Sequence, residues 1–308
     1  MSSWAVIHSL AARDKTTVMS MRALIEPNKG KLLGPAARAT FDAIISRTAA
    51  PEGVTFREDV LGGIPGWWCE PSEALPNAAI LHLHGGLFNL GSAHAFRHLV
   101  GHIARNARVS AFVPEYRLAP EHPFPRAVHD AQACFQGIVE RGVEAIAVSG
   151  DSAGGNLALA LLLLLARQAP PKIRPVGGVV LSPLTDLLMT GSSWETRAAA
   201  DPIFVRSQVE SFIKAYLNGH DPANPMASPL YGAFAGLPPI RLHVGDDEVL
   251  LDDSLRFAER AVAAGVDASV DVWEGMPHGF IGNPGVLAAA DDALAAIGAF
   301  FSSRFAAA

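Results

Sequence analysis

The sequence predicts an α/β fold with a mostly parallel central sheet, and two features of the chain predict it. From about residue 78 to the end, short apolar runs rich in β-branched residues alternate with longer helical patterns. Such alternation is typical of βαβ units, in which a crossover helix leads from one parallel strand to the next. The chain has 308 residues, of which half are hydrophobic, so it can bury one large core or a core with an attached lid.

The elements follow one another in a regular order after residue 78. Strands are expected in residues 78–86, 109–116, 145–152, 177–184, 239–248 and 269–275. Helices are expected in residues 94–105, 125–142, 153–168, 253–265 and 288–305. Residues 1 to about 50 and 196–217 have helical patterns that do not fit the alternation. These two pieces, far apart in sequence, can together form a cap over one edge of the sheet.

Composition and charge restrict the class of partner. The net charge is −6 and the basic residues form no stripe, so we expect no nucleic-acid partner. The most apolar run, Leu157–Ala166, is about half the length of a membrane span, and we expect it to be a buried helix rather than a membrane segment. Cys69 and Cys134 form no disulfide or zinc pattern, and the N-terminus has no signal-peptide pattern, so a cytoplasmic location is expected.

The stretch Gly150-Asp151-Ser152-Ala153-Gly154 carries the clearest chemical signal. It fits the pattern G-x-S-x-G, with a predicted strand before it and a predicted helix after it, which is the context that a nucleophile elbow requires. Small residues are needed where the chain turns sharply from strand to helix. Ser152 at the apex is therefore the candidate nucleophile, and a plain glycine-rich turn is the alternative.

A serine hydroxyl needs a base, and the base needs a group that orients it. His278 lies in a loop after the last predicted strand, from which it can reach across the sheet edge. Five acids crowd the preceding strand end, namely Asp246, Asp247, Glu248, Asp252 and Asp253. Asp247 is the expected orienting acid because it follows Gly245 closely, and Asp246 is the second choice. Asp252 and Asp253 fit the start of the next helix better.

Acyl transfer also needs donors for the oxyanion that forms. The N–H of Ala153, directly after the nucleophile, is one expected donor. His84-Gly85-Gly86 lies just past an earlier strand, and glycines leave the approach to their N–H groups open. Gly85 and Gly86 are therefore expected to donate as well, although this segment alone could also be a plain glycine turn.

These stretches resemble the bacterial hormone-sensitive-lipase family of α/β-hydrolase esterases. The likeness runs from about residue 80 to residue 280, in the family's order. It is carried by HGGLFNLGS, YRLAPEHPFPRAVHDA, GDSAGGNLA, and DPANPMASPLYGAFAGLPPIRLHVGDDEVLLDDS with MPHGF. The resemblance implies an α/β-hydrolase fold, in which a mostly parallel sheet is flanked by helices and carries a helical cap. It also implies serine-dependent hydrolysis of carboxylic esters with short to medium acyl chains.

The resemblance also assigns boundaries and residue roles. Residues 51–185 and 225–308 form the core, residues 1–50 contribute N-terminal helices to the cap, and residues 186–224 are the cap insertion. Ser152, Asp247 and His278 match the family's triad; Gly85, Gly86 and Ala153 match its oxyanion donors. A homodimer through an edge strand is a further implication.

One position departs from the family's pattern. Leu87 stands where the family usually has a third glycine. Leucine keeps its N–H, so a donor can survive there, but its side chain should avoid a positive φ. We expect Leu87 to point away from the oxyanion and to narrow the pocket wall. Phe88, Trp194 and Phe204 are further candidates for lining the substrate pocket.

Three histidines could suggest a metal site. His94, His98 and His102 fall on one face of a predicted helix, but no acid or thiol joins them, and the expected chemistry requires no metal or cofactor.

The sequence therefore predicts a serine carboxylesterase that acts on a small-molecule ester through an acyl-enzyme. Lactone or amide hydrolysis by the same machinery is the alternative within hydrolases. A non-catalytic small-molecule receptor on the same fold is the alternative from another class, and the presence of His278 argues against it.

Overall fold

One nine-stranded sheet organises the described part of the chain. The computed structural model describes residues 4–32, 34–167 and 173–308. The strands within these residues are β1 (Ala5–His8), β2 (Val54–Leu61), β3 (Ile64–Pro71), β4 (Ala78–Leu83), β5 (Ser110–Pro114), β6 (Ala145–Asp151), β7 (Gly178–Leu181), β8 (Ile240–Gly245) and β9 (Ala268–Trp273). Their order across the sheet is β1-β9-β8-β7-β6-β4-β5-β3-β2, and β3 pairs antiparallel with both β2 and β5. The other described pairs are parallel, which confirms the predicted α/β class.

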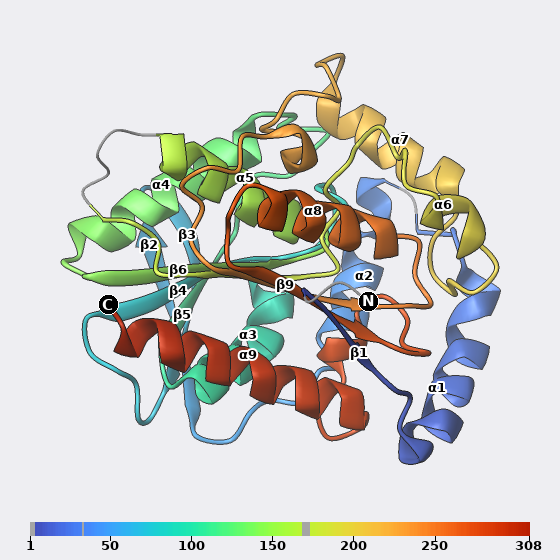
Figure 1. Ribbon diagram of the computed structural model, residues 1–308, viewed down its shortest axis with the longest axis horizontal. Coiled ribbons are helices and arrows are strands. Elements are labelled where there is room, and N and C mark those ends of the chain that lie inside the picture. The colour runs from blue at the N-terminus through green and yellow to red at the C-terminus, as the bar shows by residue number, and fades with distance from the viewer. Residues whose placement is uncertain (1–3, 33, 168–172) are drawn as a thin grey trace.

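Helices cover both faces of the sheet. The α-helices of the described residues are α1 (Ala12–Ile25), α2 (Arg38–Ile45), α3 (Ala93–Ala107), α4 (Arg126–Glu140), α5 (Ala153–Arg167), α6 (Ser193–Thr196), α7 (Arg206–Leu217), α8 (Leu251–Ala263) and α9 (Ala288–Ala306). Figure 1 shows α3 and α9 below the sheet and α4, α5 and α8 above it. A sheet covered on both faces needs apolar strands, and all six residues of β4 are buried.

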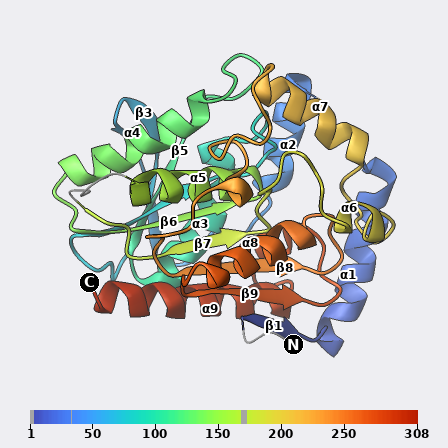
Figure 2. The same cartoon turned by 45° about the horizontal axis from the view of Figure 1, so that its top comes forward.

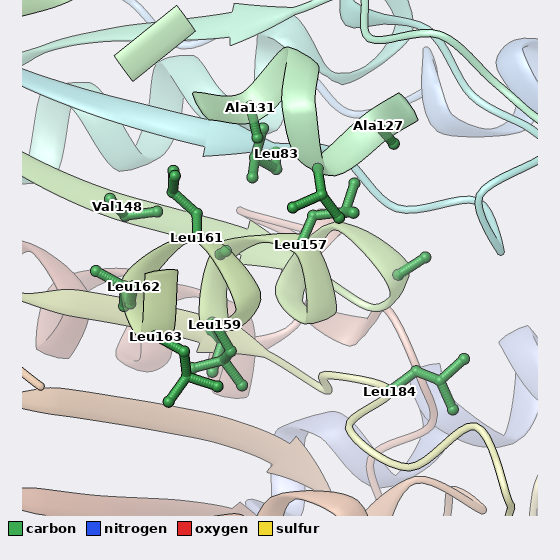
Figure 3. Close-up of a cluster of buried hydrophobic side chains, with 14 of the residues drawn as sticks. Leu83, Ala127, Ala131, Val148, Leu157, Leu159, Leu161, Leu162, Leu163 and Leu184 are labelled. Carbon is green, nitrogen blue, oxygen red and sulfur yellow. The ribbon is translucent and has the colours of Figure 1, made fainter. Parts of the chain in front are cut away.

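The apolar run Leu157–Ala166 lies within α5, in the core. Leu157 and Leu159, on opposite sides of this helix, are both buried, because the sheet lies against one side and α4 against another. Figure 3 shows these leucines packed among Leu83, Val148 and Ala131, which come from β4, β6 and α4. The interpretation of this run as a buried helix is confirmed. Among the residues that the structure describes, no helix is long and apolar enough to cross a membrane.

Three details differ from the expected elements. Residues 1–50 are not only helical, because Ala5–His8 forms β1 and extends the sheet beside β9. A four-residue strand is too short for its periodicity to separate it from a helix. The hairpin of β2 and β3 precedes residue 78, so the alternation of strands and helices does not predict it. Within 196–217 the helix begins only at Arg206, because the Asp201 carboxylate accepts the N–H groups of Ile203 and Phe204 and holds a turn there.

The N-terminal helices and the 186–224 segment meet at one end of the sheet. Both Figure 1 and Figure 2 place α1, α6 and α7 together at the right-hand side. The contacts agree, since the Lys29 ammonium donates to the carbonyl of Ala198 at 2.7 Å and the Gly30 N–H donates to that of Ile203 at 3.1 Å. Segments far apart in sequence therefore make one joint surface here.

Candidate active site

Ser152 lies at the turn between β6 and α5. Its φ is +55°, a left-handed conformation that costs a non-glycine residue about 1–2 kcal/mol and persists only where the surroundings impose it. The Ser152 N–H donates to the carbonyl of Leu181 at the end of β7 (2.8 Å), and its own carbonyl accepts the N–H of Leu184 (3.2 Å). These two bonds fix the turn against the neighbouring strand and place Ser152 at the carboxyl edge of the sheet.

The glycines around Ser152 are required by close backbone contacts. A Cβ on Gly150 would lie 2.3 Å from the carbonyl oxygen of Gly154, and one on Gly154 would lie 1.9 Å from that of Leu83. Neither contact can be relieved by a side-chain rotation, because the other atom belongs to the backbone. The strand, turn and helix predicted around Ser152 thus have the tight geometry of a nucleophile elbow.

His278 bonds to Glu248 rather than to an aspartate. Its Nδ1 lies 2.7 Å from Oε2 of Glu248, whose side chain is fully buried. The other carboxylate oxygen, Oε1, accepts the Ser182 hydroxyl and the Gly245 N–H, both at 2.7 Å. A carboxylate at Nδ1 favours the tautomer with the proton on Nδ1, which leaves Nε2 free to act as a base.

The expected contact between Asp247 and His278 is wrong. The Asp247 carboxylate turns outward and pairs with the Arg22 guanidinium of α1 at 2.9 Å. The second choice, Asp246, also points elsewhere, since it accepts the N–H of Gly275 at 2.6 Å. Glu248 reaches His278 because its side chain folds back over Gly245, three residues earlier. The sequence shows the crowd of acids here but not this reversal of direction.

Ser182 is a polar residue of the site that the sequence did not single out. It directly follows Leu181, which accepts the Ser152 N–H, and its hydroxyl holds Glu248. Hydrogen bonds thus connect the strand ends in order. Ser152 after β6 bonds to Leu181 of β7, Ser182 after β7 bonds to Glu248 after β8, and Glu248 bonds to His278 after β9. Only the position of Ser182 after an apolar strand could have drawn attention to it.

The charge around His278 changes its pKa. Burial lowers the pKa, but the negative charge of Glu248 and its hydrogen bond raise it, and the charges of Asp201 and Asp151 add to the increase. The result is a pKa above the ordinary value of 6.5 for histidine. An imidazole with this environment is a stronger base than an isolated one.

Gly85 was expected to donate to an oxyanion, and the structure contradicts this. Its N–H donates to Oδ1 of Asp151 at 3.0 Å, so it faces the residue before Ser152. A Cβ on Gly85 would lie 2.2 Å from the other Asp151 oxygen, which explains why a glycine stands there. The Gly85–Asp151 bond ties the loop after β4 to the turn that holds Ser152.

The next two residues of this loop are better placed as donors. Within the part of the chain that the structure describes, the N–H groups of Gly86, Leu87 and Ala153 have no hydrogen-bond acceptor. The Gly86 carbonyl accepts the N–H groups of Asn89 and Leu90, so the loop closes on itself as a tight turn. Successive free N–H groups in such a turn form a concavity that favours an anion.

Leu87 has a positive φ, contrary to the expectation from its side chain. Leu87 and Phe88 have φ values of +54° and +64°, and both are buried. The strain is offset by packing and hydrogen bonds, since the Asn89 amide donates to the Leu87 carbonyl at 2.6 Å and the Phe88 ring stacks on Tyr216 of α7 at 3.8 Å. A leucine here therefore keeps the backbone path that a glycine would take at lower cost.

The remaining pocket candidates come from the 186–224 segment. The Phe204 ring lies edge-on to His278 with 4.9 Å between ring centroids, so it reaches the site. Trp194 is buried in α6, and its role in lining a substrate pocket stays a prediction.

Other histidines have structural partners. His98 and His102 each place a ring nitrogen on a backbone carbonyl, those of Thr48 and Ala49, at 2.8 and 2.9 Å. His84 stacks on Tyr116 at 4.3 Å, and burial lowers its pKa to about 4, so it is neutral at pH 7. Each of these three rings thus contacts a loop, since His84 also places Nδ1 on the carbonyl of Gly85 at 2.8 Å.

Comparisons with known proteins agree with this geometry. A family model described as the alpha/beta hydrolase fold matches residues 80–282. An esterase of Acinetobacter venetianus is 35% identical over 257 residues, which cover 82% of this chain and 84% of that protein. An acetyl-hydrolase of Streptomyces hygroscopicus is 36% identical over 213 residues, covering 68% and 70%. The crystal structure of an esterase from the bacterial hormone-sensitive lipase family has a TM-score of 0.85 and 35% identity, and covers 95% of this chain and 97% of its own.

Proposed function

We propose that Ser152, His278 and Glu248 catalyse the reaction of this chain. The chain belongs to the bacterial hormone-sensitive lipase family of α/β-hydrolases and is a carboxylic ester hydrolase. The observation that carries the proposal is the 2.7 Å bond between His278 Nδ1 and Glu248 Oε2 at the sheet edge that holds Ser152. Glu248 takes the orienting role for which Asp247 was expected.

The reaction proceeds in two halves. Nε2 of His278 removes the proton of the Ser152 hydroxyl while Oγ of Ser152 attacks the carbonyl carbon of the ester. The π electrons of the carbonyl move onto the carbonyl oxygen, which becomes the oxyanion. When the tetrahedral intermediate collapses, the C–O bond to the alcohol breaks and His278 gives its proton to the leaving alcohol. Water then adds to the acyl-enzyme by the same route and releases the acid and free Ser152. Glu248 stabilises the imidazolium in both halves without taking its proton.

The oxyanion of each intermediate accepts hydrogen bonds from the backbone N–H groups of Gly86, Leu87 and Ala153. This set differs by one residue from the expected set, because Leu87 replaces Gly85. The free donors of these three residues support it, and so does the N-terminus of α5, whose dipole favours negative charge beside Ser152.

A cap built from residues 1–50 and 186–224 completes the site in this proposal. Support comes from the contacts between the two segments and from Phe204, which reaches His278 from the second of them. Phe204, Phe88 and Leu87 would then border the substrate, and the buried position of all three argues for a small acyl group.

The acyl preference can be measured with a series of 4-nitrophenyl esters from acetate to palmitate. We expect kcat/KM to peak between acetate and hexanoate and to fall by about tenfold or more by laurate, since a single methylene that does not fit already costs about 1–3 kcal/mol. The same series with Ser152→Ala gives the uncatalysed background. A maximum at laurate or palmitate would contradict the proposed small pocket.

We further propose a homodimer that pairs through the sheet edge at β1. Val6 and Ile7 of this edge strand are each 47% exposed, and an open edge with apolar side chains can pair with a second copy. Sedimentation equilibrium should then give twice the chain mass of 32.4 kDa. A single-chain mass at micromolar concentration would refute the dimer.

A further inference from the structure

The backbone that follows Glu248 is held on both sides by the 186–224 segment. The N–H of Val249 donates to Oδ2 of Asp201 at 3.0 Å. The carbonyl of the same residue accepts the hydroxyl of Ser193 at 2.6 Å. Both side chains are buried, Asp201 fully. The position of the peptide next to Glu248 is thus set by two residues of a segment that lies outside the strand–helix alternation of the core.

Asp201 also places an aromatic ring against the base. Its other oxygen, Oδ1, accepts the N–H groups of Ile203 and Phe204 at 2.7 and 2.9 Å. This turn directs Phe204 toward His278, where the two rings meet edge-on at 4.9 Å. One carboxylate therefore fixes the residue after Glu248 with one oxygen and the neighbour of His278 with the other.

We propose that Asp201 is a positioning residue for catalysis, which couples the placement of the 186–224 segment to the alignment and basicity of the Glu248–His278 pair. The inference rests on the proposed roles of Glu248 and His278. It adds a residue that does not touch the reacting atoms but acts through those two.

The pH profile of kcat/KM distinguishes a positioning role of Asp201 from a merely structural one, because the charge of Asp201 acts on the pKa of His278. The charged groups that face His278 are Glu248 from the loop after β8, Asp201 from the 186–224 segment and Asp151 from the end of β6. All three raise the pKa of His278 against the effect of its burial. The base must be neutral to act, so kcat/KM rises with pH as His278 loses its proton. Loss of one facing negative charge lowers the pKa and moves this rise to lower pH.

The test is Asp201→Asn, measured as kcat, KM and the pH profile of kcat/KM with 4-nitrophenyl butyrate. The asparagine oxygen can still accept hydrogen bonds from the N–H groups of Ile203 and Phe204. Its NH₂ then faces the Val249 N–H, and two donors cannot bond to each other, so only the bond to Val249 is lost. We expect kcat to fall by about 10- to 100-fold with little change in KM, and the acidic limb to move to lower pH. A folded variant with the wild-type kcat and acidic limb would overturn the proposal.

Asp14→Asn is the matched control. Asp14 is also a buried carboxylate that accepts two backbone N–H groups, those of Ala288 and Ala289 at the start of α9, but it does not face His278. The control should lose thermal stability while its pH profile and kcat stay those of the wild type. A shift of the acidic limb in Asp14→Asn equal to that in Asp201→Asn would overturn the proposal.

Ser193→Ala serves as the second variant if Asp201→Asn does not fold. It removes the bond to the Val249 carbonyl and the acceptor of the Asp252 N–H, but no charge, so kcat should fall while the acidic limb stays in place. An unchanged kcat in this variant would contradict the positioning role. Failure of the proposed function itself would be recognised differently, by full activity of Ser152→Ala.

Discussion

Replacing Ser152 by alanine is expected to lower kcat for 4-nitrophenyl acetate by about 10⁶-fold, the size of effect seen when the nucleophile of a serine hydrolase is removed. Without the hydroxyl no acyl-enzyme can form, whereas the oxyanion donors and the bound geometry remain. The measurement is the initial rate under saturating ester, compared with the uncatalysed rate in the same buffer.

The fold of this variant should be unchanged, which makes the comparison clean. The bonds that fix the turn use the backbone N–H and carbonyl of Ser152, and alanine keeps both. Alanine and serine have similar difficulty with a φ of +55°, so the free energy of unfolding should change by less than about 1 kcal/mol. Activity within tenfold of the wild type, in a protein freed of contaminating esterases, would eliminate Ser152 as the nucleophile.

Glu248→Gln is expected to lower kcat by about 10⁴-fold, as loss of the orienting carboxylate does in related triads. Two donors, the Ser182 hydroxyl and the Gly245 N–H, face Oε1 and retain the amide oxygen of glutamine on that side. The amide NH₂ is then directed at Nδ1 of His278. A donor at that position favours the tautomer with its proton on Nε2, which cannot accept the proton of Ser152.

The matched variants are Asp247→Asn and Asp246→Asn. Asp247 is partly exposed and pairs with Arg22, and such a pair contributes about 0–1 kcal/mol, so kcat should change by less than about threefold. Asp246 accepts the N–H of Gly275 and has no bond to His278, so its variant should behave similarly. If instead Asp247→Asn loses several orders of magnitude and Glu248→Gln does not, the acid was assigned wrongly.

The placement of Ser152 and His278 at one edge of the sheet could be predicted from the sequence because their signals are local. The glycines at 150 and 154 are imposed by backbone contacts below 2.5 Å, which leave few other residue types possible, so the pattern is visible in one chain. His278 lies in a loop directly after the last strand, at the edge to which all the parallel strands point. The alternation of apolar runs likewise gave the order of the elements from β4 onward.

The proposed roles of Glu248 and of the oxyanion donors depend on the directions of side chains and of backbone N–H groups, which the spacing of residues in the sequence does not determine. Three consecutive acids, Asp246, Asp247 and Glu248, point to Gly275, Arg22 and His278 respectively. The partners lie in loops and helices far away in sequence. Gly85 looked like a donor for the same reason, since its N–H direction is decided by Asp151, 66 residues later.

Asp201 shows a further limit of pattern reasoning. It falls inside a stretch with a helical pattern, but its carboxylate bonds nearby N–H groups and stops the helix from forming before Arg206. Its bond to Val249 crosses 48 positions in the chain. The residue that connects the 186–224 segment to the proposed base therefore carries no local signal beyond the pair Asp201-Pro202.

The central claim is that Ser152, activated by His278, becomes acylated during turnover. The direct measurement is to mix the enzyme with excess 4-nitrophenyl butyrate, quench it in acid within milliseconds to seconds, and locate the added mass by peptide mass spectrometry. The mechanism predicts one butyryl group per chain, on the peptide that contains Ser152, and no label in Ser152→Ala. A butyryl group on another residue that forms and decays at the rate of turnover would contradict it.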